Sequence, residues 1–159
     1  MTIKQSFKTG FSFGLTSGII TTLGLIVGLH AGTHSKMVIL GGILVIAIAD
    51  AFSDALGIHV SEESDRKQSK KQIWEATVST FLSKFLIALT FVAPILFMQL
   101  SAAIMVSVLW GLFLIGTFSF YLAKQKGESP KNVILEHLFI AILVIIVTNF
   151  LGNWVATFN

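Results

Sequence analysis

The chain contains no cysteine, which excludes a disulfide framework, a thiolate metal site and thiol chemistry. It is also poor in charge: Asp, Glu, Lys and Arg make up only 12% of its 159 residues, about half the fraction of a typical soluble domain. Apolar residues make up 54% of the sequence, and the mean hydropathy is +0.84. This composition predicts a membrane protein.

Five apolar runs are each long enough for a transmembrane helix, which needs about 20 residues. The sequence therefore predicts an all-α membrane protein that forms one transmembrane domain over residues 1–159. The expected spans cover residues 11–30, 37–60, 73–97, 102–123 and 132–158.

Lysine and arginine are distributed unequally among the segments that connect these spans. Nine of them lie in the N-terminal segment and in the loops 61–72 and 124–131, whereas the opposite side carries only Lys36, and Lys84 lies inside a span. Because cytoplasmic loops are enriched in Lys and Arg, we expect the N-terminus in the cytoplasm and the C-terminus outside. Since the basic residues flank membrane spans, we expect no nucleic-acid partner.

Two aspartates lie in the second span, and their spacing of four residues puts Asp50 and Asp54 on one face of a helix. A carboxylate near the middle of a bilayer costs roughly 2.5–3.5 kcal/mol, so such a residue usually lies on an ion path or has a neutralising partner. Lys84 in the next span has a similar expected depth. One interpretation is a structural Asp50–Lys84 ion pair, which leaves Asp54 without an evident basic partner.

The other interpretation is functional. Asp54, with Asp50, would bind a cation in transit, because carboxylate oxygens suit hard or borderline divalent ions such as Mg²⁺, Mn²⁺ and Fe²⁺. Either aspartate would alternatively carry a proton, since desolvation disfavours the charged carboxylate. Under this hypothesis Lys84 competes with the metal and occupies Asp50 when no metal is bound.

Further polar residues lie where the spans end. His59, Glu62 and Glu63 form a candidate recruitment site at the cytoplasmic end of the second span, or alternatively a solvated helix end. Glu136 begins the fifth span and is a candidate for the same recruitment site, or alternatively a carboxylate in the first turn of a helix.

The predicted outer turn and the first two spans supply other candidates. His30 and His34 are a candidate pair of exit ligands. Glycines four residues apart in the first span would let another helix approach closely, and neighbouring hydroxyls would line an ion path. The packing candidates are Gly14, Gly18, Gly24 and Gly28, and the path candidates are Ser17, Thr21, Ser53 and Ser61.

Two motifs carry a resemblance to a known family. Gly14-x-x-Ser17-Gly18-x-x-Thr21-Thr22-x-Gly24 resembles the first-helix signature of the vacuolar iron transporter family. Ser53-Asp54-Ala55-x-Gly57-x-x-x-Ser61 resembles its second-helix segment, with weaker similarity in the later spans. The resemblance implies a five-helix protomer, a homodimer with the first helices near the twofold axis, and export of Fe²⁺ or Mn²⁺ from the cytoplasm in exchange for protons.

The sequence also departs from this pattern. The family's first-helix aspartate falls on Ser17 and its second-helix methionine on Asp54, so a hard carboxylate replaces a soft thioether. The glutamate-rich extension after the second helix is missing. We therefore expect a minimal, divergent relative with no permanently bound cofactor. Its transported cation is either Fe²⁺- or Mn²⁺-like or an ion other than the family's.

Two function classes remain open, a cation transporter and a non-transporting membrane scaffold or assembly protein. We expect no enzymatic activity, because the sequence has no His-rich cluster and no serine paired with a base. The small size and the lack of cysteine and of targeting features favour a prokaryotic plasma membrane.

Overall fold

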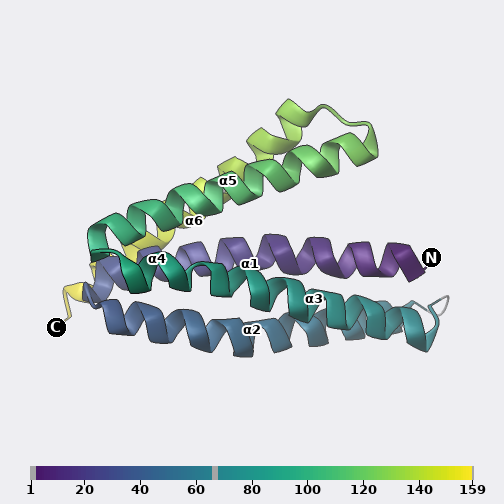
Figure 1. The fold of residues 1–159 in the computed structure, drawn as a ribbon, viewed down its shortest axis with the longest axis horizontal. Helices are drawn as coiled ribbons and strands as arrows, with labels where there is room; N and C mark the ends of the chain where they lie inside the picture. Colours follow the sequence, from purple (N-terminus) through teal and green to yellow (C-terminus); the bar gives the residue numbers. More distant parts are fainter. Residues whose placement is uncertain (1–2, 66–67, 159) are drawn as a thin grey trace. The chain divides into compact units, whose positions relative to one another are not determined.

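The computed structural model describes residues 3–65 and 68–158, which form helices and contain no strand (Figure 1). The prediction of an all-α protein is therefore confirmed. The helices are α1 (Ile3–Thr33), α2 (Lys36–Ser64), α3 (Lys70–Thr90), α4 (Val92–Phe97), α5 (Leu100–Lys126) and α6 (Pro130–Ala156).

Five segments of the described chain are long and apolar enough to cross a membrane, as the sequence predicted. Four of them are single helices, whereas the third, Lys70–Phe97, consists of α3 and α4. A turn at Phe91 separates these two helices. Pro94 explains the interruption, because it has no N–H to donate to the carbonyl oxygen of Thr90 four residues earlier.

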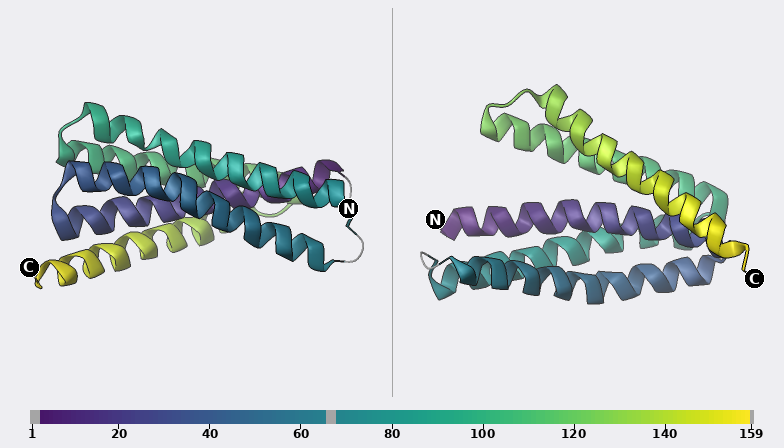
Figure 2. Two further views of the ribbon diagram at one scale, coloured as in Figure 1. Left: turned by 90° about the horizontal axis from the view of Figure 1, so that it is seen from below. Right: turned by 180° about the vertical axis from the view of Figure 1, so that it is seen from behind.

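Local sequence fixes the ends of several helices. Ser69 and Gln72 form a capping box at the start of α3, in which the Ser69 side chain accepts from the Gln72 N–H and the Gln72 side chain accepts from the Ser69 N–H. Helix α5 ends at Gly127, whose φ of 70° is left-handed, and α6 begins at Pro130. Helices α5 and α6 thus turn back on one another and run antiparallel (Figure 2).

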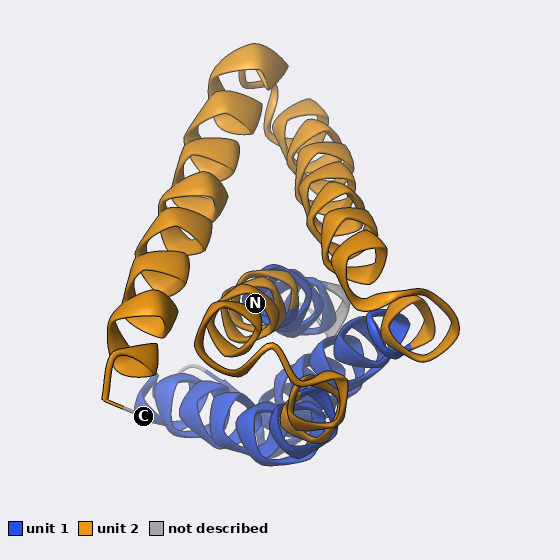
Figure 3. Cartoon of the chain, turned by 90° about the vertical axis from the view of Figure 1, so that its left-hand side faces the viewer, with its two compact units in different colours: residues 1–18, 43–92 blue, residues 19–42, 93–159 orange. Residues whose placement is uncertain are grey.

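The chain divides into two compact units (Figure 3). The first comprises residues 1–18 and 43–92, which include the first half of α1, most of α2 and the whole of α3. The second comprises residues 19–42 and 93–159, which include the second half of α1, most of α4, and α5 and α6. Each half of α1 therefore packs in a different environment.

In the first unit, glycines bring α1 and α3 into close contact. A Cβ atom added at Gly10 would meet the carbonyl oxygen of Ala76, and one added at Gly14 would meet that of Thr80. A Cβ at Gly18 would lie 3.2 Å from the Cα atom of Lys84. The three glycines are spaced by four residues, so they form one stripe along α1.

In the second unit, a second stripe of glycines at the same spacing packs against α6. A Cβ added at Gly24 would lie 3.0 Å from Val144, and those at Gly28 and Gly32 would lie 3.4 and 3.3 Å from backbone oxygens of Thr148 and Gly152. Small residues at such a contact let two helices approach in a bilayer, where lipid tails remove the hydrophobic drive for association.

We expect Gly14→Ala to lower the thermal stability of the purified protein in detergent, measured by circular dichroism. The new methyl group would meet the Thr80 backbone and the Ser83 hydroxyl, and overpacking of this kind costs about 1–3 kcal/mol. The matched control is Gly57→Ala on α2, where an added Cβ meets nothing within 4 Å. That change should leave stability unchanged or raise it, because alanine has the higher helix propensity. Equal stability of the two variants would contradict the close contact.

Candidate metal-binding site

Lys84 is the centre of a charged cluster in the first unit. Its side chain is 2% exposed, and its Nζ atom lies 2.6 Å from Asp50 Oδ2 and 2.5 Å from Asp54 Oδ2. The same ammonium donates to Ser17 Oγ at 3.0 Å. An ammonium has three N–H donors, so these three acceptors satisfy all of them.

The local sequence accounts for this geometry. Asp50 and Asp54 are one turn apart on α2, so one group on α3 can contact both. Gly18 has no side chain at the point where α1 approaches the backbone of Lys84, which lets the neighbouring Ser17 reach the ammonium. Three helices therefore contribute to one cluster.

One sequence-based expectation is wrong. Asp54 was expected to lack a basic partner, whereas it shares the Lys84 ammonium with Asp50. The reason is the i, i+4 spacing, which brings both carboxylates to the same side of α2, and the length of the lysine side chain. The expected Asp50–Lys84 pair is present, but it is part of a larger cluster.

The cluster is not evenly buried. The side chains of Asp50 and Asp54 are 30% and 18% exposed, whereas that of Lys84 is almost fully covered. Two carboxylates and one ammonium leave one negative charge in excess. A buried charge without a partner is strongly destabilising, so the ammonium stabilises the two carboxylates within the helix bundle.

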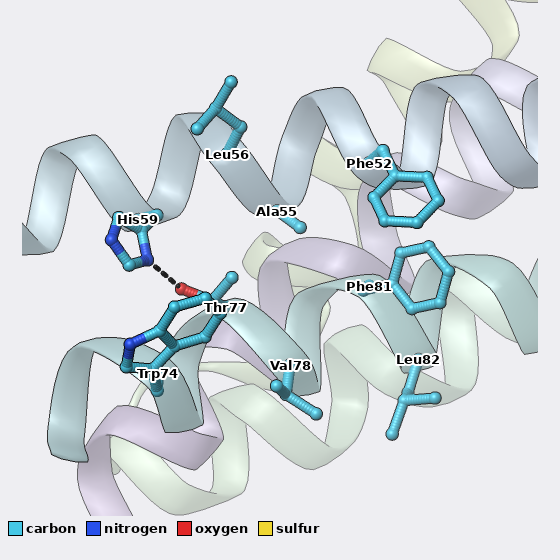
Figure 4. Close-up of a pocket in the computed structure, with 9 residues that line it drawn as sticks. All are labelled: Phe52, Ala55, Leu56, His59, Trp74, Thr77, Val78, Phe81 and Leu82. Carbon is cyan, nitrogen blue, oxygen red and sulfur yellow. Dashed lines mark hydrogen bonds between the residues drawn. The ribbon is translucent and has the colours of Figure 1, made fainter.

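His59 lies apart from this cluster. Its Nδ1 atom is 3.0 Å from Thr77 Oγ1 on α3, and its ring meets Trp74 edge-on with 4.9 Å between ring centres (Figure 4). Beside it is a cavity of about 410 Å³. Its other lining residues are apolar: Phe52, Ala55, Leu56, Trp74, Val78, Phe81 and Leu82. These apolar side chains offer an ion no replacement for its hydration shell, and the two polar lining residues, His59 and Thr77, bond to one another.

The remaining predicted ligands are not gathered around one point. Glu62 is half-buried, with one carboxylate oxygen that has no hydrogen-bond partner among the described residues, and Glu63 is exposed. Within residues 3–65 and 68–158, no group of three or more His, Asp or Glu side chains is placed to hold a metal. Asp54 and Glu63 are nine residues apart, about 13 Å along a helix, which is too far for one coordination shell.

The predicted path residues are also divided. Ser17 belongs to the cluster, and the buried hydroxyl of Thr21 has no hydrogen-bond partner in the described structure. The other candidates are exposed: Ser53, Ser61 and Glu136.

Sequence reasoning missed two hydroxyl–imidazole contacts between consecutive helices. Thr77 bonds to His59, and Ser119 Oγ on α5 lies 2.7 Å from His137 Nδ1 on α6. In each pair the two residues are 18 positions apart on either side of a turn. An equal distance from the connecting loop is the signal that would have indicated these pairs.

Comparison with known proteins gives one family. Residues 11–75 match the sequence profile of the VIT family. No curated protein matches the chain. The matched segment contains Ser17, Asp50 and Asp54 and ends before Lys84. The match covers 65 of the 159 residues, from α1 to the start of α3, so similarity to the VIT (vacuolar iron transporter) family of membrane metal-ion transporters is shown for this part of the chain.

Proposed function

We propose that this protein transports a divalent metal cation of the Fe²⁺ or Mn²⁺ type and that Asp50 and Asp54 bind the ion in transit. One observation carries the proposal: both carboxylates converge on a single cation, the Lys84 ammonium, inside membrane-spanning helices. The family match supports it independently.

The chemistry of the cluster fits such an ion. Asp50, Asp54 and Ser17 supply oxygen atoms, which Mg²⁺, Mn²⁺ and Fe²⁺ accept as ligands. In this structure the same oxygen atoms bind the ammonium of Lys84. An incoming ion therefore competes with Lys84 for its ligands, and Lys84 acts as a tethered cation that holds the three oxygen ligands together.

The remaining features of the proposal come from the charge pattern and from the family. The excess of Lys and Arg in the loops 61–72 and 124–131 favours a cytoplasmic N-terminus. Glu62 and Glu63 would then face the cytoplasm and concentrate cations for export. We also propose that the ion is exchanged for protons, that the protein is a homodimer formed through α1, and that it lies in a prokaryotic plasma membrane.

The second candidate is a scaffold that transports nothing. It is favoured by the complete hydrogen bonding of Lys84, whose three N–H groups all have acceptors within the protein. In that case the cluster only fixes the register of α1, α2 and α3.

Asp54→Asn should reduce Mn²⁺ uptake into proteoliposomes by about tenfold or more, because it removes one of two charged ligands. The variant keeps a one-to-one Lys84–Asp50 pair, so it should fold. The matched control is Glu128→Gln, the same kind of change at an exposed loop residue, which should transport at the wild-type rate. Wild-type uptake no faster than that of empty liposomes would favour the scaffold.

Lys84→Met should destabilise the metal-free protein by up to about 3–5 kcal/mol, because two partly buried carboxylates lose their partner. Mn²⁺ should then raise the melting temperature more than it does in the wild type, since the tethered competitor is gone. Lys36→Met is the control, because that ammonium bonds to the carbonyl oxygens of Leu96 and Met98 and to no carboxylate in the described contacts. An equal Mn²⁺ effect on both variants would refute competition by Lys84.

A further inference from the structure

His30 and His34 form a pair of imidazoles at the end of α1. Their ring centres are 5.1 Å apart, and the ring planes are inclined by 55°. The Nδ1 atom of His30 is buried and has no hydrogen-bond partner among the described residues. This differs from the other two imidazoles, His59 and His137, which both bond to a hydroxyl group.

The separation of the rings suits one shared metal ion. Two imidazoles that bind an ion at about 2.0–2.1 Å with a near-tetrahedral angle between them have ring centres about 5 Å apart. The observed separation of 5.1 Å between the ring centres is compatible with this requirement.

The backbone at His34 gives a second, independent observation. His34 has a φ of 50°, the one positive φ at a non-glycine residue in the part of the chain that the structure describes. Its N–H donates to the carbonyl oxygen of His30 at 3.0 Å, so it terminates α1 in the left-handed position that glycine or asparagine usually occupies. Helix termination explains the conformation, and histidine is one of the residues that adopt it more often than most. The turn places the His34 ring beside that of His30.

The electrostatic setting also suits a cation. The pair lies at the C-terminal end of a long helix, where the helix dipole favours positive charge. Lys36, two residues after His34, carries a positive charge of its own. Its ammonium bonds to the carbonyl oxygens of Leu96 and Met98, near the end of α4.

We propose that His30 and His34 form a second metal site, which binds a borderline divalent transition ion such as Zn²⁺, Ni²⁺ or Cu²⁺ through two imidazole nitrogens. Water completes the coordination shell, because His34 is exposed. Mg²⁺ and Ca²⁺ prefer oxygen ligands and are excluded. The inference goes beyond transport and does not depend on it, since the ligands differ from those of the Asp50–Asp54 site.

The test is metal binding to purified, tag-free protein in detergent. Isothermal titration with Zn²⁺ should show a site that Mg²⁺ does not occupy. Cu²⁺-loaded protein should give an electron paramagnetic resonance signal with nitrogen couplings, which carboxylate-bound Cu²⁺ does not give. His30→Gln and His34→Asn should each weaken Zn²⁺ binding by at least about tenfold, because loss of even an outer partner of a metal ligand costs 10–100-fold.

Two controls separate a metal site from a structural ring contact. His137→Gln removes an imidazole that bonds to Ser119 and should leave the nitrogen couplings unchanged. His34→Gly should keep or raise the thermal stability of the metal-free protein, because glycine adopts a positive φ without strain, and it should still abolish the site. Zn²⁺ binding of wild-type strength in both His30→Gln and His34→Asn, or a loss of stability in His34→Gly with unchanged Zn²⁺ binding, would overturn the proposal.

Discussion

The ion cluster around Lys84 constrains the first unit more than any other contact, because it places three charged groups inside helices that are apolar enough to cross a membrane. None of the three charges is tolerable there alone, since each would be buried without a partner. Together they form ion pairs between α2 and α3, and the hydrogen bond from Lys84 to Ser17 connects α1 to them at the same depth. The atoms that stabilise the bundle are therefore also the atoms proposed to bind the ion, and the structural and functional interpretations concern one site.

The cluster depends in turn on how closely α1 approaches α3. Gly10, Gly14 and Gly18 each face backbone atoms of α3, and a side chain at any of them would separate the helices and move Ser17 away from Lys84. Six residues separate Gly18 from Gly24, which rotates the second set of glycines by about 120° around α1, because α-helices have 3.6 residues per turn. The first stripe therefore meets α3, and the second, at Gly24, Gly28 and Gly32, meets α6. Two stripes of the same spacing thus serve two packing contacts.

The sequence predicted the five spans because hydropathy and helix length are local properties, and it predicted contact between Asp50 and Lys84 because consecutive helices run antiparallel. It did not predict that Asp54 shares the same ammonium, since the rotation of α2 about its own axis depends on packing against α1 and α3. His59 lies five residues after Asp54, about 140° further around α2, and its ring bonds to Thr77 on the neighbouring helix. Local pattern gives depth along a helix, whereas the direction of a side chain depends on its neighbours.

A tethered cation also limits how an ion can enter. With Lys84 in place, the cluster has one negative charge in excess, so a divalent ion bound beside an unmoved ammonium would leave one positive charge in excess in a low-dielectric setting. Lysine has a flexible four-carbon side chain, and its ammonium is readily hydrated, so the ammonium can move toward water while the backbone stays. Asp50 and Asp54 are partly exposed, whereas Lys84 is covered, which means that the carboxylates are the accessible side of the cluster. Under the proposed function, an ion that approaches the carboxylates would meet its ligands before the competing charge, and displacement of Lys84 would follow ion arrival as its electrostatic consequence.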